Sequence, residues 1–430
     1  MILFAIYNWM KTSNLIHYLT YCCLRGCIYP FSLLSYKSIH RLGAKLGPLA
    51  FMLLSKYRKR TLSNLALASD LHLINQEIPS LAKQSLGSLL TTCLEYGKLS
   101  KEKNIKRIVE CVNPSKAEEI LSTGQGLIFL CAHQANWELF FLEGTSRMSG
   151  VAIGQPIKNT YLYNWVLKMR QQFGGKIVLP HQAVKEGLRA LKQGKFLGIV
   201  GDQGMPGSGF CSLFLGRKAW TSPLPALLSY RSGSPIITAT MTRSNGKYFI
   251  HYSDPIWPDK SKSMEEEMPT LMAKALSYLE DSIKKVPSEW LWAHNKWKQQ
   301  LLGKVKKAYR QDSIAIVLPK DLATWTIFSK ELNTFREIYP TEFLTIFSPF
   351  PLIASLDVEE RLYKEYEEIK VCDYRFKLLF NLTEEKSLST YFYHLSAVKV
   401  ADLKTLSRES HLSVNDSLSN LLKGAVLNAI

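Results

Sequence analysis

The stretch Leu127-Ile128-Phe129-Leu130-Cys131-Ala132-His133-Gln134-Ala135-Asn136-Trp137-Glu138 decides how the fold is interpreted. Its first six residues are apolar, and a short apolar run that ends in a polar group is typical of a buried strand in an α/β sheet. The segment from Asn136 to Leu142 is expected to be the start of a helix, with Asn136 as its N-cap. The pattern therefore predicts a strand, a turn that carries His133, and a helix whose first turn carries Glu138.

His133 and Glu138 form the candidate catalytic pair. On one continuous helix a spacing of five residues would place them about 140° apart, but a bend between strand and helix can bring them together. Glu138 could then accept a hydrogen bond from one imidazole nitrogen while the other takes a proton from a hydroxyl. The alternative is a buried structural histidine and an exposed helical glutamate. A zinc site is disfavoured, because the HExxH pattern is absent and no second histidine is close in sequence.

A second polar segment, Gly201-Asp202-Gln203-Gly204, follows another apolar run, Phe196–Val200. Because the carboxyl ends of parallel strands meet at one edge of a sheet, Asp202 is expected on the same edge as His133. The alternative is a flexible surface turn.

The wider pattern from Gly126 to Lys298 alternates short apolar runs with helical periods, which predicts an α/β fold with a mixed sheet and flanking helices. Asn245-Gly246 predicts a hairpin. A small second α/β pattern follows from residue 313. The expected strands are 127–132, 151–154, 177–179, 196–200, 235–242, 248–252, 313–318 and 343–347, with weaker ones at 375–381 and 397–400, and the expected helices are 161–173, 182–193, 223–231, 264–285 and 321–338.

The net charge and the apolar N-terminus limit the classes of partner that the protein is expected to have. The 430 residues include 54 Lys and Arg against 36 Asp and Glu, a formal net charge of +18, which favours an anionic partner. No nucleic-acid module is recognisable, so the membrane is favoured. Residues 1–10 are almost wholly apolar, and Lys56–Arg60 is basic. We expect an interfacial or imperfectly spanning N-terminal anchor; the alternative is an amphipathic helix packed on the core.

The tryptophan-rich segment 288–298 suits either a membrane–water boundary or a core-capping helix. On helix 182–193, Lys185, Arg189 and Lys192 form a basic stripe. Such a stripe is usually a solvated face, but it could dock an acidic carrier protein or lipid phosphates.

Taken in order, these pieces resemble the lipid A late acyltransferase family, the lauroyl and myristoyl transferases of lipopolysaccharide biosynthesis. The family lies near the wider glycerolipid acyltransferases. The matching elements are Arg60–Leu65, His133–Glu138, the helix from Asn159 to Arg170, Leu188–Gly194, Gly201-Asp202-Gln203, Phe214-Leu215-Gly216 and Trp290-Leu291-Trp292. The resemblance covers roughly residues 1–300 and leaves residues 301–430 without a counterpart.

The resemblance implies His133 and Glu138 as catalytic residues. It also implies Arg170 and Asp202 as further active-site residues. With Gln203 and Asn136 they form the expected substrate-binding set, in which Asp202 orients Arg170 or the loop. No metal and no cofactor are expected.

The implied activity is transfer of a fatty acyl chain from an acyl carrier protein thioester to a hydroxyl of a lipid A precursor, at the cytoplasmic face of the inner membrane. The expected segments are a membrane-associating one at 1–60, a catalytic domain at 61–300 and a C-terminal α/β appendage at 301–430. One alternative is an acyltransferase acting on a glycerophospholipid or a phosphatidylinositol mannoside. A remoter one is a non-enzymatic protein that binds membrane surfaces through its basic residues.

Overall fold

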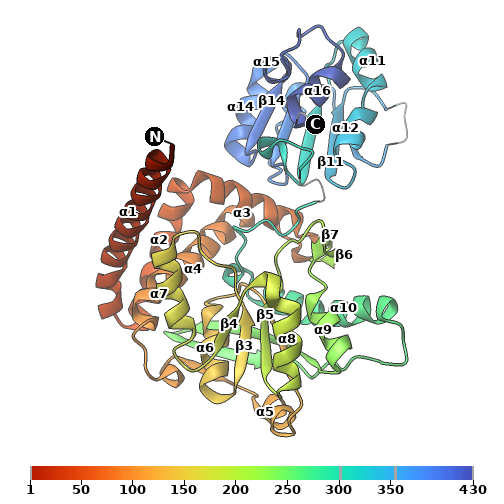
Figure 1. The fold of residues 1–430 in the computed structure, drawn as a ribbon. Coiled ribbons are helices and arrows are strands. Elements are labelled where there is room, and N and C mark those ends of the chain that lie inside the picture. Colours follow the sequence, from red (N-terminus) through yellow and green to blue (C-terminus); the bar gives the residue numbers. More distant parts are fainter. Residues whose placement is uncertain (1, 300–302, 353–355, 429–430) are drawn as a thin grey trace. The chain divides into compact units, whose positions relative to one another are not determined.

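The computed structural model describes residues 2–299, 303–352 and 356–428, with side chains from residue 14 onward. The expected apolar side chains of residues 1–10 therefore lie outside the described part. The chain forms two compact units (Figure 1). Unit 1 contains Met1–Ala50, Lys83–Asp202 and Pro223–Leu291, and unit 2 contains Phe51–Ala82, Gln203–Ser222 and Trp292–Ile430. The limits of these discontinuous units differ from the segments 1–60, 61–300 and 301–430, which stay a functional prediction.

Unit 1 is built on a seven-stranded mixed sheet of order β1-β9-β8-β2-β5-β3-β4. Its strands are β1 (Val109–Cys111), β2 (Leu127–Cys131), β3 (Gly150–Ile153), β4 (Lys176–Val178), β5 (Phe196–Val200), β8 (Ile236–Ser244) and β9 (Lys247–Tyr252). All neighbours are parallel except β8 and β9. These two strands meet at Asn245-Gly246, whose φ values of 51° and 86° match the hairpin turn that this dipeptide predicts.

Helices cover both faces of this sheet. On one face, which carries Leu197, lie α8 (Ala183–Lys192), α9 (Leu224–Ser232) and α10 (Met264–Lys285). On the other face, around Phe129 and Phe196, lie α5 (Ser115–Ser122) and α6 (Glu138–Arg147). α7 (Thr160–Arg170) begins at Asn159, whose side chain accepts hydrogen bonds from two backbone amides of the first turn. The remaining helices that begin in unit 1 are α1 (Ile2–Ile28) and α2 (Tyr36–Leu53).

Unit 2 contains a five-stranded parallel sheet of order β12-β11-β10-β13-β14. Its strands are β10 (Ser313–Val317), β11 (Phe343–Ser348), β12 (Glu359–Leu362), β13 (Leu378–Asn381) and β14 (Lys399–Asp402). Its helices are α11 (Leu322–Lys330), α12 (Asn333–Ile338), α13 (Tyr366–Ile369), α14 (Lys386–Leu395), α15 (Leu403–Ser410) and α16 (Leu418–Val426). In chain order the strands run 3-2-1-4-5, the doubly wound arrangement in which ligands usually bind beyond the carboxyl ends of the strands.

Residues from the first 300 also belong to unit 2. They include α3 (Ser55–Leu67) and a hairpin of β6 (Phe210–Phe214) and β7 (Arg217–Thr221). The side chain of Lys377, 1% exposed, donates hydrogen bonds to Asn64 in α3 at 2.8 Å and to Asn295 at 3.0 Å, and it forms a salt bridge with Asp312 at 2.7 Å. A buried lysine with three oxygen partners ties these segments to the sheet, since losing the partners would leave its charge uncompensated.

The prediction of an α/β fold with a mixed sheet and flanking helices is confirmed. In the described part of the chain, no helix combines the length and the apolar character needed to cross a membrane. The tryptophans of segment 288–298 lie in the core and not at a membrane boundary, because each is at most 1% exposed: Trp290, Trp292 and Trp297. Lys59 is also buried and donates to the Ala397 carbonyl at 2.9 Å, so it does not face head groups as expected.

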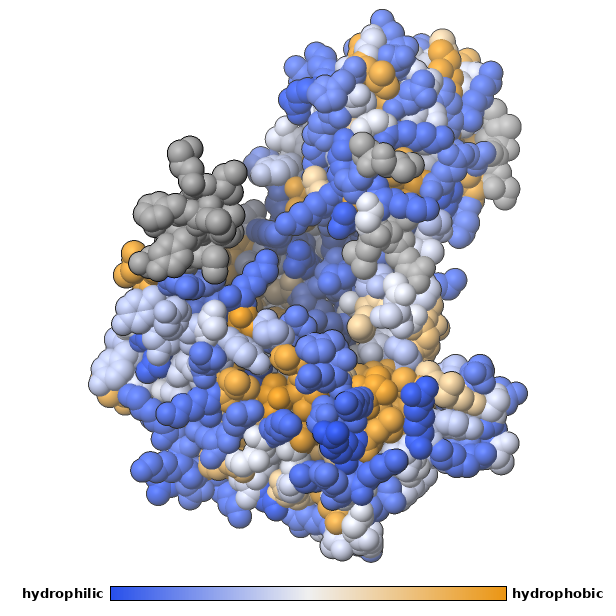
Figure 2. Space-filling model, viewed as in Figure 1, coloured by the Kyte–Doolittle hydropathy of each residue, from blue (hydrophilic) through white to orange (hydrophobic). Residues whose placement is uncertain are grey.

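The surface of the molecule is uneven in hydropathy. Figure 2 shows hydrophobic residues gathered on part of the face that carries β3 and β5, whereas the five-stranded domain presents mainly hydrophilic residues in this view. On the described part of α1, Leu15, Ile16 and Leu19 are each more than half exposed.

Candidate active site

The site begins where β2 and β5 end side by side. These parallel strands pair Cys131 with Val200, and two residues further along each strand stand His133 and Asp202. The imidazole Nδ1 of His133 lies 2.7 Å from one oxygen of Asp202, and the His133 backbone N–H donates to the other oxygen at 2.9 Å. The expectation that Asp202 stands on the same edge as His133 is therefore confirmed, and the two side chains are in direct contact.

Asp202 is a fully buried acceptor. Its side chain is 0% exposed, and the Trp290 indole N–H donates to the same oxygen as the His133 amide, at 2.7 Å. A carboxylate can only accept hydrogen bonds, so it holds His133 as the tautomer that carries its proton on Nδ1. Nε2 is then the nitrogen that takes up a proton. The His133 side chain is 16% exposed, which lets a substrate reach it.

Glu138 lies in the first turn of α6 and has different partners from those expected. The Arg170 guanidinium donates two hydrogen bonds to its carboxylate, at 2.7 and 2.6 Å, and the Tyr96 hydroxyl donates a third at 2.7 Å. Burial raises the pKa of Glu138, but the Arg170 charge and hydrogen bonds, with smaller contributions from Tyr96 and His133, hold it below its ordinary value. Glu138 is thus an ionised, rigidly held carboxylate.

Two expected roles are corrected by this geometry. We expected Glu138 to orient the imidazole of His133 and Asp202 to orient Arg170 or the loop, but the structure pairs Asp202 with His133 and Arg170 with Glu138. The reason is the strand register, which places Asp202 directly beside His133. Glu138, one helical turn away, faces α7 and its Arg170.

Asn136, which we expected among the substrate-binding residues, is buried and bonded to other protein groups. Its side chain is 0% exposed and donates to Glu95 in α4 (Glu77–Leu99) at 2.7 Å, while its oxygen accepts from the Glu138 amide at 3.3 Å. α6 therefore begins at Glu138, two residues later than predicted. Glu95 in turn accepts from the Tyr248 hydroxyl at 2.7 Å, and so joins α4 and β9 to the loop.

Sequence reasoning missed Glu95 and Tyr96, because α4 is about 40 residues away from the motif. One signal was available. Ser88, Thr92, Glu95 and Leu99 follow one another at spacings of three or four residues, so they share one face of a helix. That face is buried, and Glu95 places a carboxylate on it. A buried carboxylate needs partners, and that need points to a polar network.

A small apolar cavity is lined in part by Trp137, from the segment that follows His133. Its volume is about 50 Å³, and its lining includes Cys131, Trp137, Phe141, Phe196 and Gly198. The Trp137 ring also packs edge-on against His133, with 5.1 Å between ring centroids. Trp137 thus contacts His133 and also lines the cavity.

The remaining expected residues have other surroundings. Gln203 belongs to unit 2 and lines a larger cavity there. The Arg170 side chain is 20% exposed, so part of it remains accessible beside Glu138. Within the described residues, no group of three or more His, Cys, Asp and Glu side chains is arranged to hold a metal ion.

Comparisons with known proteins bear on this arrangement. The model of the bacterial lipid A biosynthesis acyltransferase family matches residues 11–299. The lipid A biosynthesis lauroyltransferase of Escherichia coli (strain K12) is 23% identical over 283 residues, which cover 65% of this chain and 91% of the relative. The lipid A biosynthesis palmitoleoyltransferase of the same strain and the lipid A biosynthesis acyltransferase of Shigella flexneri are each 23% identical over 293 residues, covering 65% of this chain and 90% of either relative. The chain therefore belongs to the bacterial lipid A biosynthesis acyltransferase family.

Proposed function

We propose that this protein transfers a fatty acyl chain from an acyl carrier protein thioester to a hydroxyl of a lipid A precursor, with His133 as the general base. The observation that carries the proposal is the hydrogen bond between His133 Nδ1 and the buried Asp202 carboxylate. The family membership supports acyl transfer as the reaction class. The choice of donor, acceptor hydroxyl and residue roles is the proposal.

In this mechanism Nε2 of His133 takes the proton of the acceptor hydroxyl as its oxygen attacks the thioester carbonyl. Asp202 keeps the imidazole in the required tautomer and stabilises the imidazolium that forms, as the third member of a catalytic triad does. The thiolate leaves as the tetrahedral intermediate collapses and takes the proton back from His133. No covalent acyl-enzyme is needed, and general-base help of this kind contributes roughly 10² to 10⁴-fold.

Glu138 acts in this proposal through charge and through its position. Its carboxylate interacts electrostatically with His133. Its two hydrogen bonds from Arg170 brace the first turn of α6 against α7. The backbone N–H groups of Asn136 and Trp137, at the positive end of α6, are the proposed donors to the negative oxygen of the intermediate.

The small apolar cavity beside Trp137 is the proposed start of the acyl-chain site. Its lining is mostly aromatic and aliphatic, as hydrocarbon binding requires, and it includes Trp137, which contacts His133. A volume of about 50 Å³ is too small for a whole chain, so side chains around it must move when the donor binds.

Membrane association at the cytoplasmic face is part of the proposal. Its support is the exposed Leu15, Ile16 and Leu19 on α1, together with the net charge of +18. Apolar side chains on one helix and basic residues elsewhere suit binding to an anionic membrane surface.

The test is an acyl transfer assay with purified protein, lauroyl or myristoyl acyl carrier protein and a lipid A precursor. We expect His133→Ala to lose at least about 100-fold in rate, whereas His181→Ala, at an exposed position of unit 1, keeps it. A His133→Ala protein with near wild-type activity would overturn the assignment. Mass spectrometry of lipids from a deletion strain tests the acceptor, because loss of one secondary acyl chain from lipid A identifies it. A change confined to glycerophospholipids or phosphatidylinositol mannosides would identify one of those lipids as the acceptor in place of the lipid A precursor.

A further inference from the structure

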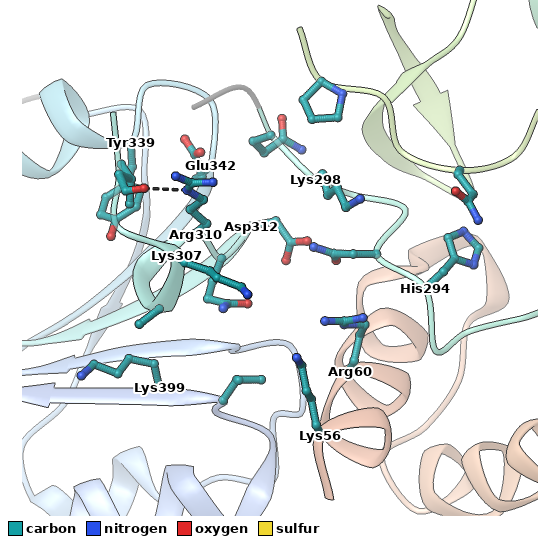
Figure 3. Close-up of a pocket in the computed structure, with 18 residues that line it drawn as sticks. Lys56, Arg60, His294, Lys298, Lys307, Arg310, Asp312, Tyr339, Glu342 and Lys399 are labelled. Atoms are coloured by element: carbon teal, nitrogen blue, oxygen red, sulfur yellow. Dashed lines mark hydrogen bonds between the residues drawn. The ribbon is translucent and has the colours of Figure 1, made fainter. Parts of the chain in front are cut away.

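Unit 2 contains a cavity of about 770 Å³ that the acyl transfer mechanism does not use. It lies at the amino-terminal edge of the five-stranded sheet, where Asp312 precedes β10, Glu342 precedes β11 and Lys399 begins β14. This is the opposite edge from the one at which doubly wound sheets usually bind nucleotides. The cavity is also lined by residues from α3 and from the segment 294–299 (Figure 3). We call it the basic pocket.

The basic pocket carries a surplus of positive charge. Among its lining residues five cations have no salt-bridge partner within the described part of the chain, namely Lys56, Arg60, Lys298, Lys307 and Arg310. Figure 3 shows Lys56 and Arg60 extending from α3 toward the middle of the pocket, with Lys307 across from them. Like charges held this close repel one another, so an anion among them would be stabilising.

The acidic residues of the pocket offset little of this charge. Asp312 is neutralised by Lys377 beneath the pocket floor, at 2.7 Å. Burial, with a smaller contribution from Asp312, raises the pKa of Glu342 to about 7, although the Thr341 amide and Arg336 act in the opposite direction. The Glu342 carboxyl is therefore only partly ionised near neutral pH.

Two of the cations are already preorganised. Arg60 donates one guanidinium N–H to the Ala293 carbonyl at 3.2 Å, and Arg310 donates its Nε–H to the Val305 carbonyl at 2.6 Å. A guanidinium has five N–H donors, so each keeps others for a ligand. Arginine held in this way is suited to paired hydrogen bonds with phosphate oxygens.

The other lining residues narrow the class of ligand. Tyr339, only 1% exposed, is the one Phe, Tyr or Trp among the described lining residues, so the pocket offers a base no exposed ring of these three kinds. Gln203, Asn295 and Gln311 contribute amides that can bind hydroxyl groups. The volume lies in the usual range for small-ligand sites, about 300 to 1,000 Å³, whereas a carrier protein requires a docking face of about 800 Å².

We propose that the basic pocket binds a phosphorylated sugar, either as a soluble molecule or as the head group of a lipid. The five unpaired cations bind the phosphate oxygens, and the amides bind sugar hydroxyls. This inference does not depend on the acyl transfer chemistry, because the lining residues lie in unit 2 and ten of the eighteen come from beyond residue 300, outside the family match.

The experiment compares two triple variants of the full-length protein. The pocket variant carries Lys56→Gln, Lys298→Gln and Lys307→Gln, all at exposed positions of unit 2. The control variant carries Lys364→Gln, Lys386→Gln and Lys404→Gln, which are exposed in the same unit but outside the pocket and which change the net charge equally. Thermal melts confirm that both variants are folded.

Calorimetry with glucose 1,6-bisphosphate tests the soluble ligand, and flotation with vesicles that contain a phosphorylated glycolipid tests the head group. We expect the pocket variant to bind at least one of these probes at least about tenfold more weakly than the wild type, because the loss of even one charge-assisted hydrogen bond contributes roughly that factor. The control variant should bind within twofold, and glucose should not bind. Which probe responds identifies the source of the ligand. Equal losses in both variants, or no phosphate-dependent binding to the wild type at about 0.05 M salt, would overturn the proposal.

Discussion

Replacing Asp202 with asparagine should impair catalysis far more than it impairs folding. In the wild-type protein one oxygen of Asp202 accepts from both the His133 amide and the Trp290 indole, and the other faces Nδ1 of His133. The single oxygen of an asparagine will stay with the first two donors. Its NH₂ group then faces Nδ1, which must become an acceptor and transfer its proton to Nε2. The imidazole is then protonated on the atom that should act as the base.

The size of the effect follows from the distance. An imidazolium and a carboxylate 2.7 Å apart attract each other by about 6 kcal/mol at an effective dielectric constant of about 20. Because about 1.4 kcal/mol corresponds to a tenfold change in rate, the upper limit of the loss is about 10⁴-fold. We expect kcat to fall by roughly 10³ to 10⁴-fold with little change in KM, because the Asp202 side chain is 0% exposed.

The assay is single-turnover transfer of a radiolabelled acyl chain from acyl carrier protein, measured alongside Glu138→Gln and the exposed control Asp281→Asn. Glu138→Gln keeps the Tyr96 hydrogen bond and leaves Asp202 in place, so its loss should be smaller, about 10 to 100-fold. Asp281→Asn should behave as wild type. If Glu138→Gln were slower than Asp202→Asn, then Glu138 and not Asp202 would be the partner of the histidine, and our reasoning would be refuted.

Three further results are expected. Arg170→Gln leaves the Glu138 carboxylate buried without its cation, and should lower the free energy of unfolding by about 3 kcal/mol. In urea denaturation, adding Glu138→Gln to this variant should restore part of the lost stability. Additive losses from the two substitutions would contradict the pairing. Glu342 has a pKa of about 7 in the folded protein against an ordinary 4.5. The stability that the folded protein gains from binding this proton is therefore lost as the pH rises through this range. At pH 8 Glu342→Gln should be more stable than wild type by up to ~3 kcal/mol, and equal denaturation midpoints at pH 5 and pH 8 in both proteins would argue against it. Gly198→Ala places a methyl group 3.4 Å from Ala152 in the apolar cavity; it should slow transfer of long acyl chains more than short ones, and an unchanged chain-length profile would place the acyl site elsewhere.

Much of the sheet could be predicted from the sequence, because apolar strands and hydrophilic turns differ locally. β5, Phe196–Val200, has the expected ends, as does α10, and the hairpin at Asn245-Gly246 is present. The helix expected at 321–338 is divided into α11 and α12, although no proline or glycine marks the break. The short strands β1 and β12 were missed, because three or four residues carry too little periodicity.

The candidate site was only half predictable, for a similar reason. That His133 and Asp202 share one edge follows from two local patterns and a general rule for parallel sheets. That they touch depends on β2 and β5 being neighbours in the register Cys131 to Val200, a non-local fact that no single segment contains. The pairing of Glu138 with Arg170 likewise depends on how α6 packs against α7.

The buried lysine of unit 2 has a consequence for the order of synthesis. Asn64 and Lys377 are 313 residues apart in the chain. At a ribosomal rate of about 5 to 20 residues per second, α3 waits roughly 15 to 60 s for its buried partner to be made. During that interval Ser63 and Asn64 lack their partners Arg375 and Lys377, so this helix is a natural ligand for a chaperone or for the membrane surface while translation continues. A ribosome-bound chain stalled before Lys377 should therefore expose α3 to protease, and one stalled well after it should protect the helix.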